Sequence, residues 1–365
     1  MALTDLKNNI IPVSYTNGLV GLDLGFGRIK ISSNETNIQF PSIVGNQVSN
    51  FAKPAPVASF DELLNTLTLI YNGQIFYIGN NAINNTRNGK ISLRQNKHDD
   101  NDEQTKVKIM TALALLTSES QYEANFTLTS GLPVLEYNSQ KDQLYKILYN
   151  NGQPFEFIMQ YGNKQVPKKI TCSKVKIISQ SEGAYYNYLL SSDGNIINER
   201  IKNVSGVVCV CDIGFRTIDI VFMDNGRYLD ISDQINNGVV NIHQEVLRLI
   251  MQEFNIKKEL KDIDNIIRSK QMFFGTKTYD LTDIITKACK PFAENLIESL
   301  YTVHNGELGD LQMILLAGGG SELIFDIVKE ELKNIVRVDK IYNAEFSNSQ
   351  GYYKYGMLLR NQGLF

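Results

Sequence analysis

The sequence LDLGFGRIKI at residues 22–31 returns in altered form at residues 211–220, as CDIGFRTIDI. Each copy has an aspartate in an apolar run, a tight turn that contains glycine, and a second apolar run, which predicts strand, turn and strand. Glycine adopts positive φ and lets backbone N–H groups gather around an anion. The aspartate adds a negative charge, which would repel a phosphate unless a cation lay between them. The pair therefore predicts two hairpins that hold one magnesium nucleotide from opposite sides.

The length and composition are those of an ordinary folded protein with two domains. The chain has 365 residues, of which 43% are hydrophobic and 21% charged. The net charge is −3 and no run rich in Lys and Arg stands out, so we expect no direct contact with nucleic acid. We see neither a signal peptide nor an apolar run near the ~20 residues that a bilayer requires. We therefore expect a cytoplasmic protein without a membrane contact.

The cysteines and histidines form no pattern typical of metal binding or nucleophilic catalysis. There is no C-x-x-C pair, and Cys209 and Cys211 alternate with valines in an apolar run. This favours small buried side chains in a reducing compartment over metal ligands or disulfides. His98, His243 and His304 are scattered along the chain, so we expect surface or core positions for them.

Strands and helices alternate along both halves of the chain, as in an α/β protein. Between them, exposed segments are expected at 51–59 and 87–103. Hydrophobic periodicity predicts strands at 61–71, 74–79, 126–131, 174–178, 207–211, 218–223, 227–231 and 311–316. It predicts helices at 106–116, 139–148, 182–190, 241–254, 291–301 and 322–332. Because the second half repeats the order of the first, we infer a duplication with a cleft between two α/β halves.

Side chains beyond the aspartates also fit phosphate binding. Lys30 stands on the outgoing strand of the first turn, where its cation could reach a β- or γ-phosphate, although an exposed strand lysine would look the same. In the second turn the Thr217 hydroxyl could bond a terminal phosphate, and Asp219 could orient the turn or the water shell of a metal. The alternative is a plain hairpin with a strand-favouring threonine and an edge aspartate. One such turn is a weak signal, but two are much less common by chance.

A third element follows the strand at residues 313–316. It is the segment Gly318-Gly319-Gly320-Ser321, which leads directly into a predicted helix. Consecutive glycines let the backbone approach a planar or anionic ligand, and a helix N-terminus offers free N–H groups. A tight strand-to-helix connection is the alternative, but it rarely needs three glycines in a row.

The order of the two aspartate turns and the glycine turn resembles that of the actin-like ATPases, the superfamily that also holds DnaK-type chaperones, sugar kinases and bacterial cytoskeletal actins. The resemblance covers nearly the whole chain. The segments FPSIVG at 40–45 and SGLPV at 130–134, with the pair Phe26-Gly27, look like ParM-type plasmid-segregation actins and their archaeal-like relatives. The length agrees, because DnaK-type chaperones append a peptide-binding region and sugar kinases usually run longer.

The resemblance implies an α/β protein with the actin-like ATPase fold, in which two duplicated α/β domains surround a nucleotide cleft. Domain I would comprise residues 1–180, with a small inserted subdomain at about 35–105, and would be completed by residues 340–365. Domain II would comprise residues 181–339. The tyrosines at 352, 353 and 355 would lie on a C-terminal helix packed on the first domain, with a subunit interface as the alternative.

The resemblance also implies the site residues. Asp23 and Asp212 would hold Mg²⁺ through its waters, and Gln180 would orient the attacking water, with Glu182 as the second choice; both belong to the strand-to-helix connection at 177–184. Arg216 departs from many relatives and would either reach the nucleotide or face solvent. The two turns would contact the phosphates and the glycine turn would line the adenosine of ATP, or the guanosine of GTP in its place, through Gly25, Phe26, Gly27, Lys30, Gly214, Phe215, Arg216, Thr217, Gly318, Gly319, Gly320 and Ser321.

The implied function is a nucleotide-dependent, filament-forming ATPase. Its partners would be further copies of the chain and a DNA-binding adaptor protein of ParR type, and its work would be plasmid segregation. Two alternatives stay open at this point. One is a small-molecule kinase of the same fold, with Glu182 as general base. The other is an actin-like scaffold that does not polymerise.

Overall fold

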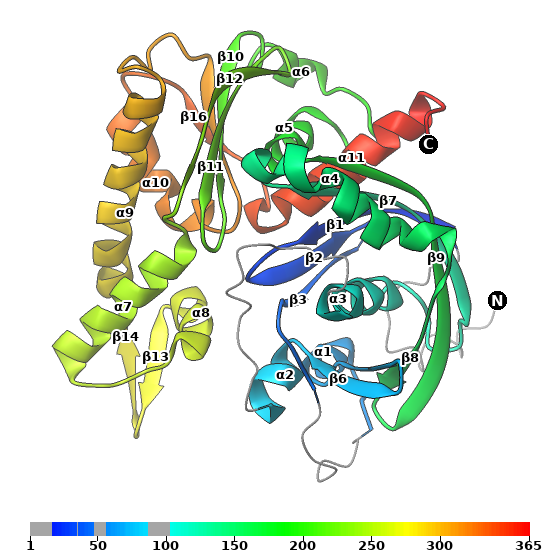
Figure 1. Ribbon diagram of the computed structural model, residues 1–365. Helices are drawn as coiled ribbons and strands as arrows, with labels where there is room; N and C mark the ends of the chain where they lie inside the picture. Colours follow the sequence, from blue (N-terminus) through cyan, green and yellow to red (C-terminus); the bar gives the residue numbers. More distant parts are fainter. Residues whose placement is uncertain (1–16, 35, 47–55, 87–102) are drawn as a thin grey trace, which may run out of the picture. The chain divides into compact units, whose positions relative to one another are not determined.

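The computed structural model describes residues 17–34, 36–46, 56–86 and 103–365, and the chain divides into two compact units. Unit 1 comprises Met1–Asn195 with Asn348–Phe365, and unit 2 comprises Ile196–Ser347 (Figure 1). The domain boundaries expected at residues 180 and 339 stay predictions. The exposed segments expected at 51–59 and 87–103, together with His98, lie largely outside the described residues.

Unit 1 is built on a nine-stranded sheet in the order β3-β2-β1-β7-β9-β8-β5-β6-β4. The central strands β1, β7 and β9 are parallel, and the outer neighbours pair in antiparallel fashion. The strands are β1 (Asn17–Leu24), β2 (Arg28–Ser32), β3 (Asn37–Pro41), β4 (Val44–Asn46), β5 (Thr68–Tyr71), β6 (Gln74–Ile78), β7 (Glu123–Leu132), β8 (Phe155–Tyr161) and β9 (Lys164–Ser179).

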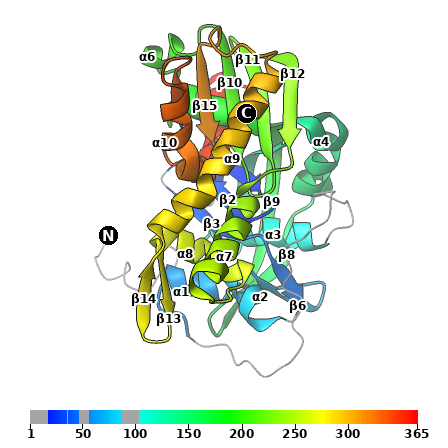
Figure 2. The ribbon, with the colours of Figure 1, turned by 90° about the vertical axis from the view of Figure 1, so that its left-hand side faces the viewer.

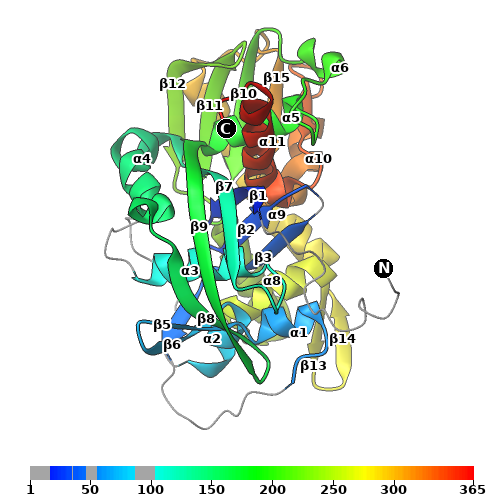
Figure 3. The same ribbon diagram turned by 90° about the vertical axis from the view of Figure 1, so that its right-hand side faces the viewer.

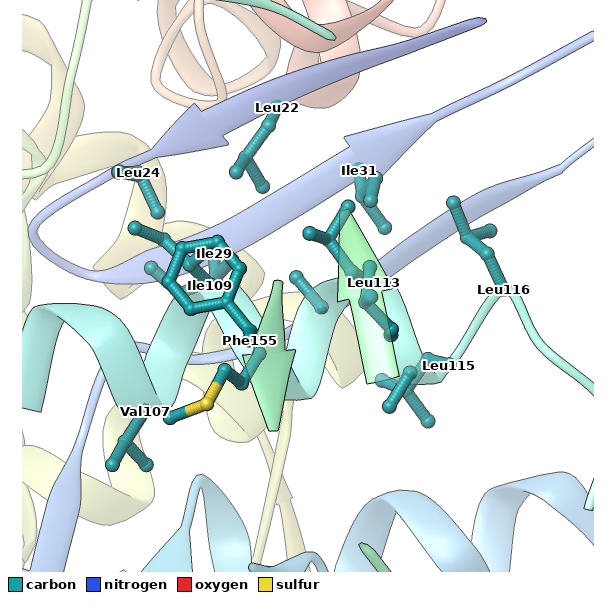
Figure 4. Close-up of a cluster of buried hydrophobic side chains, with 14 of the residues drawn as sticks. Leu22, Leu24, Ile29, Ile31, Val107, Ile109, Leu113, Leu115, Leu116 and Phe155 are labelled. Atoms are coloured by element: carbon teal, nitrogen blue, oxygen red, sulfur yellow. The ribbon is translucent and has the colours of Figure 1, made fainter. Parts of the chain in front are cut away.

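The helices of unit 1 are α1 (Phe60–Asn65), α2 (Asn80–Asn85), α3 (Glu103–Ala114), α4 (Val134–Tyr149), α5 (Gln180–Leu189) and most of α11 (Ser347–Asn361), with a 3₁₀ turn η2 (Asn150–Gly152). Leu22, Leu24, Ile29 and Ile31 of the first hairpin are buried against α3, as Figure 4 shows. Since side chains alternate along a strand, this packing turns Asp23 and Lys30 to the other face of the hairpin.

Helix α11 lies alongside α5 and β7 (Figure 3), and glycines make room for it. A Cβ atom at Gly183 of α5 would lie 2.5 Å from the Tyr352 ring, and one at Gly131 of β7 would lie 2.5 Å from the same ring. Tyr352 is fully buried, which agrees with a C-terminal helix packed on the first part of the chain. The interpretation of these tyrosines as part of a packed helix is therefore confirmed.

Unit 2 is built on a five-stranded sheet in the order β12-β11-β10-β15-β16, with β10, β15 and β16 parallel. Its strands are β10 (Val207–Ile213), β11 (Ile218–Asp224), β12 (Arg227–Ile235), β15 (Met313–Ala317) and β16 (Val338–Lys340). The first three form an antiparallel meander that repeats the pairing of β1, β2 and β3.

Three helices, α7 (Val239–Phe254), α9 (Thr282–Val303) and α10 (Ser321–Leu332), pack on one face of this sheet around Cys209, Cys211 and Ile220. The hairpin of β13 (Gln271–Phe274) and β14 (Lys277–Asp280) follows α8 (Leu260–Ser269) and is seen beside it in Figure 2. The remaining elements are α6 (Asn198–Ile201) and the 3₁₀ turn η3 (Ala344–Phe346).

Helices α1 and α9 differ from the predictions made for their segments. The strand expected at 61–71 is wrong in its first half, because Ser59 caps α1 by accepting a hydrogen bond from the Glu62 amide. The helix expected at 291–301 begins at Thr282 instead and contains Pro291. All four cysteines are buried, as expected, and His243 is buried too. No described helix is both long and apolar enough to span a membrane.

Candidate functional site

The hairpin of β1 and β2 and the hairpin of β10 and β11 have the same register. Asp23 of β1 lies opposite Lys30 of β2, and Asp212 of β10 lies opposite Asp219 of β11. The third strand continues the correspondence, because Lys30 pairs with Gln39 and Asp219 pairs with Gln234. We call Asp23, Lys30 and Gln39 row 1, and Asp212, Asp219 and Gln234 row 2. Each row runs across three strands on the face that the apolar residues of the hairpin leave free.

Row 1 combines opposite charges. Lys30 Nζ lies 3.7 Å from Asp23 Oδ2, and the Asp23 side chain is only 4% exposed. The Gln180 Nε2 atom lies 3.5 Å from Asp23 Oδ1, at the long end of a hydrogen bond. Gln39 does not join this pair, since its Oε1 atom accepts from Arg28 Nε at 2.8 Å. The structure thus brings Asp23, Lys30 and Gln180 together, although Gln180 is far from the hairpin in sequence.

The start of α5 explains why Gln180 and Glu182 point to different places. Ser179 caps the helix by accepting from the Glu182 amide at 3.0 Å, and the Glu182 carboxylate accepts from the Ser179 amide at 2.9 Å. This capping box uses the Glu182 side chain to hold the helix end. Gln180, the first residue of the helix, is left to face Asp23. The geometry therefore favours Gln180 over Glu182 as the group near the carboxylate.

The first hairpin receives hydrogen bonds from two neighbouring segments. The Gly27 carbonyl accepts from the Ser42 amide at 2.9 Å, and the Ser130 hydroxyl donates to the Leu22 carbonyl at 2.6 Å. A Cβ atom at Gly25 would lie 2.5 Å from the Arg28 carbonyl oxygen, so the turn closes too tightly for a side chain there. Phe26 is half-buried at the tip.

Row 2 combines like charges. Asp212 and Asp219 are 4% and 3% exposed and stand directly opposite one another. The Gln234 Nε2 atom donates to Asp219 Oδ1 at 2.7 Å. Like charges that face each other across two strands are destabilising. Row 2 thus pairs two carboxylates, whereas row 1 pairs a carboxylate with a cation.

The second turn packs on the start of α7. The Gly214 amide donates to the Thr217 carbonyl at 2.9 Å, while the Gly214 and Phe215 carbonyls accept from the Val239 and Val240 amides. The Phe215 ring lies edge-on to His243, with 5.8 Å between centroids. Burial lowers the pKa of His243, a shift that Asp264 opposes, which favours the neutral ring beside Phe215.

Thr217 and Arg216 are half-buried at the tip of this turn. Partial burial lowers the pKa of the Arg216 guanidinium from its usual value, although arginine stays protonated in proteins. Neither residue is part of row 2. Arg216 thus offers a positive charge at the turn itself, where the first turn has Gly27.

The glycine turn closes on the end of β10. Gly318 has φ +76°, and a Cβ atom there would lie 2.5 Å from Asp212 Oδ1. A Cβ atom at Gly320 would collide with Ile213, but one at Gly319 would meet nothing within 4 Å. The Ser321 hydroxyl is buried and donates to the Gly318 carbonyl at 2.8 Å. Gly318, Gly320 and Ser321 therefore shape the turn, and Gly319 is the part that a ligand could approach.

Sequence analysis missed three residues of this arrangement. Gln39 and Gln234 complete the rows, and the Ser347 hydroxyl accepts from the Gly318 amide at 3.1 Å. The shared glutamine could have been found only by aligning the third strands of the two halves. Ser347 is 29 positions from Gly318, so no local pattern would have indicated it.

Comparison with known proteins agrees with this arrangement. A family model described as "Actin like proteins N terminal domain" matches residues 21–183, and one described as "Archaeal actin homologue MreB-like, C-terminal" matches residues 210–330. The duplicated hairpin units thus define an actin-like protein, and the chain belongs to the actin-like superfamily.

Its relatives include archaeal actin homologues and ParM proteins. An archaeal actin homologue from Thermoplasma volcanium is 24% identical over 227 residues, which are 56% of this chain and 69% of the homologue. The structure of a 15-stranded ParM filament from Clostridium botulinum has a TM-score of 0.70 at 21% identity and covers 93% of this chain and 99% of that chain. An archaeal actin homologue solved in complex with ADP has a TM-score of 0.73 at 19% identity, with the same coverage. These matches establish the actin-like fold.

Proposed function

We propose that this protein is a nucleotide-dependent, filament-forming actin-like ATPase of the cytoplasm. The observation that carries the proposal is the pair of rows, in which a buried aspartate lies at the same position of the same three-stranded meander in both units. Relatives of the same fold include an ADP complex and a filament, which supports both parts of the proposal. We assign Asp23 and Lys30 of row 1, Asp212 and Asp219 of row 2, and the glycine turn to the nucleotide and its cation.

The residues present fit a hydrated magnesium ion. Mg²⁺ usually keeps several waters and takes one or two carboxylates together with substrate phosphates. Row 2 offers two buried carboxylates, Asp212 and Asp219, and row 1 offers Asp23. Among the described residues no group of three or more His, Cys, Asp or Glu side chains is placed to hold a metal. When bound, the ion would neutralise phosphate charge and so allow the terminal phosphate to be attacked.

Hydrolysis would depend on positioning rather than on proton transfer by a strong base. Gln180 faces Asp23, and an amide can orient water without taking its proton. In this proposal water adds to the terminal phosphorus as the bond to the bridging oxygen breaks, so that the nucleoside diphosphate leaves and inorganic phosphate and a proton are released. Lys30 and the backbone of the two turns would hold the phosphate oxygens. Glu182 contributes by holding the start of α5.

Assembly and its biological use form the finer part of the proposal. Copies of one chain that associate head to tail without closing a ring build an open filament. Nucleotide binding would favour the form that adds to the filament, and hydrolysis would weaken the contact. As in the plasmid-segregation actins that the sequence resembles, we propose that a DNA-binding adaptor protein of ParR type links the filament to plasmid DNA.

Light scattering and electron microscopy of the purified full-length protein test the function. We expect filaments on addition of Mg²⁺ with ATP or GTP, and none with EDTA. Asp212→Asn should abolish assembly, because it removes a row 2 charge. Asp224→Asn is the matched control, since Asp224 ends the same strand β11 that carries Asp219 and lies away from the turn.

Two outcomes would replace the proposal with one of the alternatives. Tight nucleotide binding without assembly at any protein concentration would favour a scaffold. Phosphorylation of a sugar or carboxylic acid, tested with a panel of both and labelled ATP, would favour the small-molecule kinase. Loss of assembly in Asp224→Asn as well as Asp212→Asn would show that the substitutions act through folding, and a thermal melt of each variant identifies that case.

A further inference from the structure

One of the two buried aspartates of row 2 receives a hydrogen bond from the side chain of Gln234. Asp212 and Asp219 are both nearly inaccessible to solvent and face each other across β10 and β11. Burial penalises a charged carboxylate unless hydrogen bonds or an opposite charge compensate. The Gln234 amide supplies such a bond from the edge strand β12, at 2.7 Å from Asp219 Oδ1.

The corresponding glutamine of row 1 behaves differently. Gln39 also lies opposite the middle residue of its row, but that residue is Lys30, which has only donors. The Gln39 side chain turns its oxygen to Arg28 Nε instead. The same residue type at the same register thus donates to a carboxylate in unit 2 and accepts from an arginine in unit 1. The direction of the Gln234 side chain therefore follows from the second carboxylate of its row.

We propose that Gln234 is a positioning residue for the cation of the nucleotide site. Its hydrogen bond from β12 fixes one oxygen of the Asp219 carboxylate and so determines how that carboxylate lies opposite Asp212. The inference rests on the proposed function, because it assigns the hydrated Mg²⁺ of the nucleotide to row 2. Groups that orient the residues around a metal contribute strongly to its affinity even though they do not touch it.

The test compares the Mg²⁺ dependence of ATP binding in matched variants of the full-length protein. Binding of a non-hydrolysable ATP analogue is measured by calorimetry over a range of Mg²⁺ concentrations and in EDTA. Gln234→Met keeps the length of the side chain and removes the amide. We expect the Mg²⁺ concentration for half-maximal binding to rise about tenfold, as for other groups that orient metal ligands. Binding in EDTA should not change, since no cation is then involved.

Two further variants separate positioning from a general structural role. Gln39→Met makes the same change at the same register in unit 1, and we expect wild-type Mg²⁺ dependence from it. In an Asp219→Asn background, Gln234→Met should have no additional effect on Mg²⁺ dependence, because its action passes through Asp219. Gln234 is half-exposed on an edge strand, and if the methionine variant does not fold, Gln234→Thr carries the same test.

The results distinguish the inference from the proposed function. Wild-type Mg²⁺ dependence in Gln234→Met, or an equal shift in Gln39→Met, would overturn the role of Gln234 while leaving nucleotide binding in place. An additive effect in the Asp219→Asn background would also overturn it. If the wild-type protein binds neither ATP nor GTP at any Mg²⁺ concentration, the proposed function itself fails and the inference falls with it.

Discussion

Rows 1 and 2 are the same three-stranded arrangement with a different residue in the middle. Both begin with a buried aspartate and end with a glutamine, but the central position is Lys30 in unit 1 and Asp219 in unit 2. Row 1 pairs a carboxylate with a lysine, whereas row 2 pairs two carboxylates. The comparison teaches that a duplicated scaffold can keep its backbone pairing while one residue at the centre of the row changes from a cation to a carboxylate.

The largest effect is expected from removing the cation of row 1. Lys30→Met leaves Asp23 as a buried carboxylate without its lysine, and loss of one partner of a buried ion pair costs about 3–5 kcal/mol. The Lys30 side chain is 16% exposed, so we expect the lower end of that range. Urea unfolding of the variant, without nucleotide, measures the loss.

Lys169→Met provides the control for this change within unit 1. Lys169 lies 3.0 Å from Glu123, but both side chains are exposed, and surface pairs contribute about 0–1 kcal/mol. If Lys30→Met and Lys169→Met had the same small effect, row 1 would not depend on its internal ion pair. The contrast between the two rows would then lose its electrostatic basis.

A smaller but still clear difference is expected between the two turn glycines. A Cβ atom at Gly25 would lie 2.5 Å from the Arg28 carbonyl, whereas one at the corresponding Gly214 would lie 3.1 Å from the Thr217 carbonyl. Forced overlap of this kind typically costs about 1–3 kcal/mol. We therefore expect Gly25→Ala to lose about 1–3 kcal/mol of unfolding free energy and Gly214→Ala less than about 1 kcal/mol. Equal losses in urea unfolding would mean that the two turns close equally tightly.

Much of this arrangement could be predicted from local sequence, and the rest could not be predicted in that way. The hairpins, the glycine turn and the alternation of strands and helices depend on periodicity and turn chemistry within about ten residues, so sequence analysis found them. The contact of Gln180 with Asp23 depends on the parallel pairing of β7 with β9. No local pattern around Gln180 indicates that pairing. All the site residues, including the neighbours Asp23, Lys30 and Gln180, stay predictions as nucleotide contacts.

Local rules also explain where sequence analysis failed. Residues 61–65, of sequence DELLN, do not alternate as a strand does, and Ser59 and Glu62 form a helix start there. The roles proposed for Glu182 and Ser321 at the nucleotide stay predictions. The structure adds that the Glu182 side chain completes a capping box and that the buried Ser321 hydroxyl bonds the Gly318 carbonyl.

Measurements of stability and of hydrolysis should distinguish the roles of Gln180 and Glu182 at the start of α5. Glu182→Ala removes half of a capping box, and we expect a loss of about 0.5–1 kcal/mol in unfolding free energy with hydrolysis retained. Gln180→Ala should leave stability nearly unchanged and slow phosphate release at saturating nucleotide. A coupled phosphate assay and a thermal melt on both variants check this. Slower hydrolysis in Glu182→Ala alone would return the water-orienting role to Glu182.

The smallest expected effect has the opposite sign. Asp219→Asn removes one of two like charges that face each other in row 2, so the protein without nucleotide should gain about 0.2–1 kcal/mol of stability. The asparagine oxygen can still accept the hydrogen bond of Gln234, which keeps the packing comparable. In Mg²⁺ and ATP the gain should become a loss, because the wild-type row then has its cation and the variant binds it more weakly. Thermal melts in EDTA and in Mg²⁺ with ATP measure both signs, and destabilisation in EDTA would contradict the view that row 2 is a site of charge conflict that its ligand relieves.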